Sequence, residues 1–165
     1  LEGRRDQFLA EWTLQGAAKR EATREVNGAI DRLSLYAGWT NKYQQLFSSV
    51  NPVAQPYFNY SIPEATGVVS IVAPEESSLL GLVTAIAPVI IGGNSCVVLA
   101  SHSKPLCSIS FAEVLQTSDV PAGVVNILTG QRAELLEQFA SHMDVNAISY
   151  LGDDAGEIKI VEENA

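Results

Sequence analysis

The second half of the chain alternates short apolar runs with segments of helical length. The four runs are rich in β-branched residues, and they span residues 67–73, 95–99, 123–128 and 147–151. Nearly continuous apolar runs are typical of strands that are covered on both faces. The segments between them, residues 77–91, 105–117 and 133–140, carry broad apolar faces at helical spacing. This alternation predicts right-handed crossovers and an α/β fold with a parallel, doubly wound sheet flanked by helices.

The first third of the chain predicts long helices. Phe8 and Trp12 share one helical face, and apolar residues recur at intervals of three and four from Val26 to Phe47. The opposite face of this second segment carries charged residues that we expect to be exposed: Glu25, Asp31, Arg32 and Lys42. Residues 48–63 contain three prolines, which lack a backbone donor, so an extended connector is expected there.

This pattern predicts one domain made of two packed parts. The N-terminal helices and the connector span residues 1–63, and the α/β portion spans residues 64–165. The predicted sheet is incomplete, because a doubly wound sheet usually needs more than four strands before both edges are protected. We expect the chain to be a piece of a longer protein, or another chain to cover the open edge. Expressed alone, these residues are expected to self-associate.

The charge and apolar content exclude several classes of protein. Nineteen acidic residues against ten basic ones give a formal net charge of −9, which argues against nucleic acid and anionic membrane surfaces as partners. The longest apolar stretch, Leu79–Ile91, contains Gly81 and Pro88 and is shorter than the roughly 20 residues of a membrane span. No export leader opens the sequence, and two cysteines cannot make a disulfide framework. A cytoplasmic location is therefore expected.

No catalytic or metal-binding pattern stands out. The glycines at 92–93 and 130 match neither the dinucleotide fingerprint nor a P-loop, and the two histidines lie far apart. His102 and Cys107 are close enough in sequence to suggest a base and a nucleophile, but Cys107 falls on the apolar side of its helix and Cys96 is in mid-strand. We expect both thiols to be buried.

Two further clusters have simpler explanations than a ligand site. Asp153, Asp154 and Glu157 carry cation-binding groups, but acidic residues at a helix start more often complement the helix dipole. The aromatic residues Tyr57, Phe58 and Tyr60 have no cations between them, so they predict aromatic packing in the connector rather than base stacking.

Five ordered segments carry recognisable motifs. They are Leu35-Tyr36-Ala37-Gly38-Trp39, Pro63-Glu64-Ala65-Thr66-Gly67, Ile86-Ala87-Pro88 followed by Gly93-Asn94-Ser95, Asp119-Val120-Pro121-Ala122-Gly123, and the run from Ser141 to Gly152. This ordered set resembles the aldehyde dehydrogenase superfamily, in its cofactor-binding domain and the helices before it. The resemblance implies a Rossmann-type sheet that binds a nicotinamide dinucleotide, and oxidation of aldehydes through a thiohemiacetal.

The sequence departs from that family at its catalytic and ribose-binding motifs. After Pro74 the family shows Trp-Asn-Phe-Pro, whose Asn donates to the substrate oxyanion, whereas residues 75–78 here are Glu-Glu-Ser-Ser. An ionised carboxylate at Glu76 cannot donate a hydrogen bond to an oxyanion. The family's Lys and Glu that contact the adenosine ribose are replaced by Ala100 and Ser103.

Two more departures concern the diphosphate. Arg132 and Leu136 stand where the family has glycines that let the backbone approach the cofactor, and the Leu136 side chain would occupy space that the dinucleotide needs. The family's Gly-Ser at the pyrophosphate is Gly152-Asp153, which adds a carboxylate of the wrong sign. The family's nucleophilic Cys and general-base Glu lie further along than this chain reaches.

The leading hypothesis is a non-catalytic module with a structural, scaffolding or assembly role and a degraded NAD site. It resembles the silent second module of the two-module, family 16 type members. No catalytic residue, metal ligand or bound cofactor is expected, and the partner would be the remainder of a longer chain, another aldehyde dehydrogenase subunit or a second copy.

The alternative is the NAD(P)-binding part of an active aldehyde dehydrogenase whose catalytic residues lie outside this chain. NAD or NADP would then be held at these positions: Val72, Ala73, Pro74, Ser101, Ser103 and Gly152. A crevice for a different small ligand at the carboxyl ends of the strands is a third option.

Overall fold

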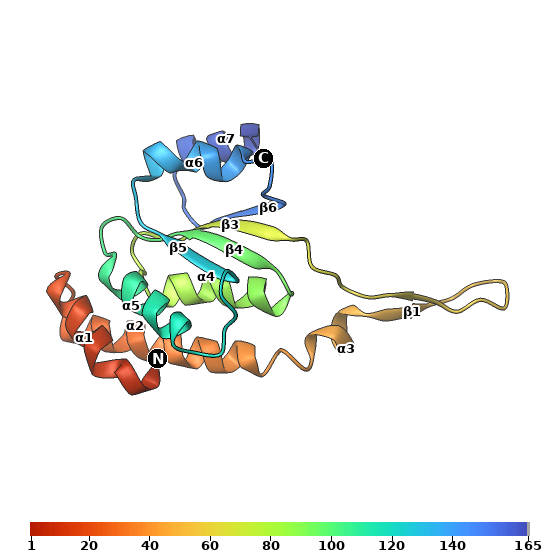
Figure 1. The fold of residues 1–165 in the computed structure, drawn as a ribbon, viewed down its shortest axis with the longest axis horizontal. Helices are drawn as coiled ribbons and strands as arrows, with labels where there is room; N and C mark the ends of the chain where they lie inside the picture. Colours follow the sequence, from red (N-terminus) through yellow and green to blue (C-terminus); the bar gives the residue numbers. More distant parts are fainter. Residues whose placement is uncertain (165) are drawn as a thin grey trace.

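A four-stranded parallel sheet forms the centre of the molecule. The computed structural model describes residues 1–164. The strand order is β5–β4–β3–β6 (Figure 1). The strands are β3 (Val68–Val72), β4 (Ser95–Leu99), β5 (Val125–Leu128) and β6 (Ala147–Tyr150). All four apolar runs are therefore strands of one parallel sheet, as the alternation predicts.

Helices cover both faces of this sheet (Figure 1). On one face lie α4 (Leu80–Ile91) and α5 (Leu106–Gln116), and α1 (Arg5–Leu14) and α2 (Lys19–Ala37) pack outside them after a short 3-10 turn over Glu2–Arg4. The other face carries α6 (Arg132–Ser141) and α7 (Ala155–Asn164). The predicted α/β fold, with long N-terminal helices before a sheet flanked by helices, is confirmed.

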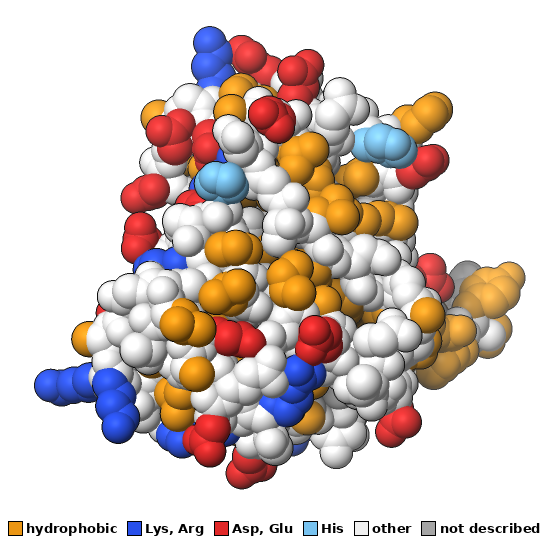
Figure 2. Space-filling view, turned by 60° about the vertical axis from the view of Figure 1, so that its left-hand side comes forward, with side chains coloured by type: hydrophobic (Ala, Val, Ile, Leu, Met, Phe, Trp, Pro, Cys, Tyr) orange, Lys and Arg blue, Asp and Glu red, His pale blue; other side chains and the backbone are white. Residues whose placement is uncertain are grey.

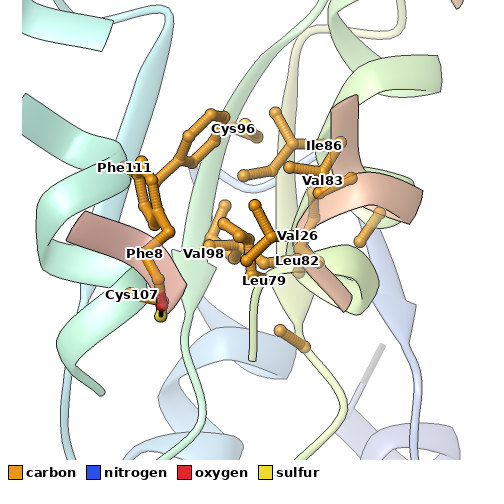
Figure 3. Packing of buried hydrophobic residues seen from close by; sticks show 14 of the residues in the cluster. Phe8, Val26, Leu79, Leu82, Val83, Ile86, Cys96, Val98, Cys107 and Phe111 are labelled. Atoms are coloured by element: carbon orange, nitrogen blue, oxygen red, sulfur yellow. Dashed lines mark hydrogen bonds between the residues drawn. The ribbon is translucent and has the colours of Figure 1, made fainter. Parts of the chain in front are cut away.

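One core joins the N-terminal helices to the sheet. Figure 3 shows Phe8 from α1 and Val26 from α2 packed with Val83 of α4, Val98 of β4 and Phe111 of α5. A smaller cluster on the opposite face holds α6 on the sheet, and its buried members are Val72, Leu99, Leu136 and Phe139. Removal of this apolar surface from water supplies the main driving force for the fold.

The N-terminal region differs from the sequence expectation in two respects. The apolar stripe expected as one long helix is broken, because α2 ends at Ala37 and a separate short helix, α3 (Tyr43–Phe47), follows. Glu25, expected on the exposed face, is only 7% exposed. Its carboxylate accepts hydrogen bonds from Ser77 Oγ at 2.5 Å and from the backbone N–H of Leu80 at 3.0 Å. The expectation of exposure is wrong for Glu25, because this side of α2 faces the start of α4.

The connector is a β-hairpin that projects from the body of the molecule (Figure 1). It is extended, as expected, but its two arms, β1 (Ser49–Asn51) and β2 (Asn59–Ser61), pair with each other in antiparallel register. Phe58 and Tyr60 pack together with ring centroids 5.4 Å apart, and both side chains stay exposed. The aromatic packing is thus within the hairpin.

Both thiols are buried, which confirms the prediction. Cys96 and Cys107 are fully buried and free. Burial raises the pKa of Cys96 to about 11. Burial, with the nearby Glu11 and Glu25 carboxylates, raises the pKa of Cys107 to about 12. Both groups therefore stay protonated and unreactive at neutral pH. Within residues 1–164, no helix has the length and apolar character needed to cross a membrane.

Truncation of Phe111 tests whether the core is built as described. Phe111 is 2% exposed and packs between α5 and the sheet, so Phe111→Ala should lower the free energy of unfolding by about 3–5 kcal/mol through lost contacts and a cavity. Ile109 on the same helix is 46% exposed, and Ile109→Ala should cost less than about 1 kcal/mol. Urea unfolding followed by circular dichroism measures both, and equal losses would contradict this core.

Candidate functional site

The loops that follow the four parallel strands meet at one edge of the sheet. In open α/β sheets this carboxyl edge is where ligands bind. The six residues expected to hold a cofactor lie at the ends of β3, β4 and β6 or in the loops directly after them, and therefore at this edge: Val72, Ala73, Pro74, Ser101, Ser103 and Gly152. The fold brings them together.

Arg132, the first residue of α6, connects the loop after β3 to α7 at this edge. Its side chain is only 14% exposed. Nη2 donates to the carbonyl of Ala73, Nη1 lies 3.3 Å from Glu157 Oε2 on α7, and Nε lies 3.3 Å from Glu75 Oε1 after β3. The guanidinium therefore spans the edge between β3 and α7.

The carboxylate of Glu75, in the loop after β3, lies among the polar groups of the loop that follows β4. It accepts hydrogen bonds from Ser101 Oγ at 2.9 Å and Ser103 Oγ at 3.1 Å, and from the backbone N–H groups of His102 at 3.2 Å and Ser103 at 3.3 Å. Burial alone would raise the pKa of Glu75, but these hydrogen bonds outweigh it, so the pKa is lowered from its ordinary value. Glu75 is therefore a stably ionised anion in a cradle made by the Ser101 and Ser103 hydroxyl groups and two backbone N–H groups. The single Ser101 hydroxyl proton is shared between this carboxylate and the backbone carbonyl of Glu75, which is also 2.9 Å away.

Tyr150 and Glu157 close the edge beside Gly152. Tyr150 Oη donates to Glu157 Oε2 at 2.5 Å. Burial, followed by the hydrogen bond and charge of Glu157, raises the pKa of Tyr150 to about 12, which keeps the phenol neutral. A Cβ atom added at Gly152 would lie 2.3 Å from Tyr150 Oη, so the tyrosine lies directly against the backbone of this residue.

The acidic group at the start of α7 is a helix cap. Asp154 Oδ1 accepts the backbone N–H of Glu157 at 2.8 Å, as expected for a carboxylate at a helix N-terminus. Within residues 1–164, no group of three or more His, Cys, Asp or Glu side chains could hold a metal ion. The helix-dipole interpretation of this cluster is confirmed for Asp154.

The N-terminus of α4 is likewise occupied by the chain itself. Glu25 accepts the Leu80 N–H, and Ser77 Oγ accepts the Gly81 N–H at 2.8 Å. These bonds satisfy backbone donors that an anionic ligand at a helix start would otherwise use.

Several other candidate residues take no part in these polar contacts. Leu136 is 2% exposed and packs against Val72 and Leu99 beneath α6, so the side chain that spans the edge is that of Arg132, one turn earlier. His102 is exposed, whereas Cys107 is buried with its thiol 3.7 Å from the carbonyl of Phe8. They do not form a nucleophile–base pair.

The side of the molecule that carries α6 and α7 is strongly acidic. Residues 131–164 contain eight carboxylates and two cationic side chains. Figure 2 shows acidic side chains over the upper part of one face, where these helices lie, and most of the visible Lys and Arg side chains lower down. A polyanionic ligand approaching this side of the molecule meets repulsion rather than attraction.

Comparison with known proteins decides the family. The profile of the "Aldehyde dehydrogenase family" matches residues 1–165. The chain belongs to the aldehyde dehydrogenase family. Retinal dehydrogenase 2 of Mus musculus is 30% identical over 142 residues, which are 86% of this chain and 26% of that protein. Omega-crystallin of Enteroctopus dofleini is 27% identical over 137 residues, which are 83% of this chain and 27% of that protein.

Solved structures of two dehydrogenases share the fold. The glyceraldehyde-3-phosphate dehydrogenase GapN of Methanocaldococcus jannaschii, solved with NADP, superposes with a TM-score of 0.88 at 24% identity, over 99% of this chain and 36% of that one. The NAD⁺ complex of the Bacillus cereus aldehyde dehydrogenase gives a TM-score of 0.89 at 22% identity, over 98% of this chain and 33% of that one. This chain therefore spans about a quarter to a third of the relatives that it matches.

The acid stability of the aldehyde dehydrogenase fold in this chain should depend on Glu75. Because its pKa is lowered in the folded protein, the unfolded chain binds the proton more readily. The carboxylate thus stabilises the fold above its ordinary pKa, and this contribution is lost as pH falls through the folded pKa. Glu75→Gln should make the unfolding midpoint in urea fall less steeply between about pH 6 and pH 3.

Glu76 provides the matched control for this measurement. Its side chain is 95% exposed, so Glu76→Gln should follow the unsubstituted protein. Identical pH dependence for Glu75→Gln and the unsubstituted protein would show that the cradle does not stabilise the ionised form.

Proposed function

We propose that this chain is a non-catalytic aldehyde dehydrogenase module whose role is structural, as a scaffold or assembly unit. Its partner is the remainder of a longer chain, another aldehyde dehydrogenase subunit or a second copy of itself. The two buried free thiols and the acidic composition favour a cytoplasmic setting.

The Arg132 bridge is the observation that carries this proposal. A dinucleotide at the carboxyl edge needs open backbone groups and room for a diphosphate. Here the Ala73 carbonyl is bonded to Arg132, and two carboxylates, Glu75 and Glu157, face the same guanidinium. A diphosphate would have to displace at least one of these carboxylates from its cation. The residues present therefore do not fit NAD or NADP.

Other groups at the edge also argue against cofactor binding. Ser101 and Ser103 bond to Glu75, Gly152 is covered by Tyr150, and the Val72 carbonyl accepts the Leu151 N–H at 3.0 Å. Of the six positions that could hold a cofactor in the alternative, five have a partner in this chain or a side chain against them; Pro74 is the exception. The alternative, an active NAD(P)-binding part of a dehydrogenase, is not favoured because it needs these contacts to break.

A structural role fits the contrast between the core and this edge. The apolar core is continuous from α1 to the sheet, so the fold does not depend on a ligand at the edge. Both outer strands, β5 and β6, have one unpaired side within the described residues. Open strand edges are normally covered by another element or chain, which suits an assembly unit.

Calorimetric titration of the purified chain with NAD⁺ and with NADP⁺ tests the proposal. We expect no measurable heat of binding for either cofactor up to millimolar concentration, because the Arg132 bridge and the surrounding carboxylates oppose the diphosphate. An NAD-binding family member measured in parallel gives the positive control. A micromolar dissociation constant for either cofactor would overturn the proposal.

A further inference from the structure

A cavity of about 300 Å³ lies beneath the last turn of α6, at the amino edge of the sheet. Val68, which begins β3, lines it together with Asp144 and Val145, which precede β6. We propose that this cavity binds an organic ammonium ion, with the apolar part of the ligand against the sheet and the charged group beside Asp144. The cavity is at the opposite edge from the loops after the strands, so its occupancy is independent of the proposed function.

The cavity exists because the side chains beneath α6 change in size along the strands. Towards the carboxyl edge, the space under the helix is filled by Val72, Leu99 and Leu136. One row nearer the amino edge, the residues in register on the same face are Ser70, Val97 and Asn126. The amide of Asn126 folds back onto the sheet, where it donates to two backbone carbonyls at 2.8 and 3.2 Å. The space between this row and the helix therefore stays unfilled.

The interior of the cavity suits an apolar group. Its apolar lining residues are Val68, Val97, Phe139 and Val145. The hydroxyl group of Ser70 donates to the carbonyl of Phe139 at 2.8 Å, so it leaves no unsatisfied donor in the cavity. Pockets for small molecules are typically apolar with a few polar groups that orient the ligand, and this volume is at the lower end of their range. A single aromatic ring or a short alkyl chain is the matching size.

The rim of the cavity favours a positive charge. Asp144 is exposed there and forms no ion pair with any residue from 1 to 164. The last turn of α6 carries no basic side chain, so the negative pole of the helix is not neutralised at this end. His142 Nδ1 accepts the backbone N–H of Asp144 at 3.3 Å, which requires this nitrogen to be unprotonated. The rim is therefore anionic, and an ammonium group is its electrostatic complement.

Titration with 2-phenylethylammonium, followed by the amide signals of Val68, Gln138 and Val145 in NMR spectra, tests the site. We expect saturable shifts of these signals. Neutral 2-phenylethanol should bind about fivefold more weakly, because it lacks the single partly exposed ion pair with Asp144. The anion 3-phenylpropionate should bind more weakly than either. Equal affinity for all three compounds, or no saturable shift with the ammonium ion, would overturn the inference.

Asp144→Asn separates the charge at the rim from the apolar cavity. It should lower the affinity for the ammonium ion to that for the alcohol and leave the affinity for the alcohol unchanged. Asp153→Asn is the matched control, because it removes the same charge from an exposed residue beyond the other end of β6. Both affinities should then equal those of the unsubstituted chain. An Asp144→Asn variant that keeps full affinity for the ammonium ion would contradict the proposed role of the carboxylate.

Val97→Phe tests the cavity itself. Val97 is half-buried and lines the cavity, so the larger ring should enter it and abolish binding of both the ammonium ion and the alcohol. Val97→Leu, which adds less volume, provides a second variant if the first does not fold, and it should weaken both compounds severalfold. Undiminished binding in a folded Val97 variant would overturn the inference. None of these results bears on cofactor binding at the carboxyl edge, which the NAD⁺ and NADP⁺ titrations measure.

Discussion

The ion pairs of Arg132 with Glu75 and Glu157 determine the character of the sheet's carboxyl edge. The guanidinium is largely buried, so it needs anionic partners, and a buried charge that loses its partner is strongly destabilising. The chain supplies these partners from the loop after β3 and from α7. The same edge in a nucleotide-binding protein leaves such groups open for a ligand. In this chain, a bound diphosphate would compete with Glu75 and Glu157 for the guanidinium of Arg132.

This competition is separate from what stabilises the fold. Phe8, Val26, Val83 and Phe111 pack on the opposite face of the sheet from α6, and their burial does not involve the edge loops. Apolar burial at about 25 cal/mol per Å² outweighs the small net contribution of exposed polar contacts. The edge residues can therefore differ from those of a catalytic relative while the sheet and its helices keep the family's fold.

The sequence predicted the sheet well, because strands buried on both faces must be apolar along their length, and this property is local. It predicted the edge less completely. Arg132 stood out as a replaced glycine, but its partners Glu75 and Glu157 lie 57 and 25 residues away and share no motif with it. Glu25 was misassigned because helical periodicity separates apolar from polar faces without showing which polar group meets another helix start. Tyr150, inside an apolar run, gave no sign of its bond to Glu157.

The two carboxylates that face Arg132 are not equivalent. Glu157 is in the first turn of α7, its backbone N–H is held by Asp154, and α7 is anchored to the smaller cluster through Val161. Moving Glu157 would disturb the helix and its cap. Glu75 follows a strand end in a loop, and its side chain reaches solvent. Glu157 is therefore held in place by its helix, whereas Glu75 is held by the hydrogen bonds and the ion pair of a loop.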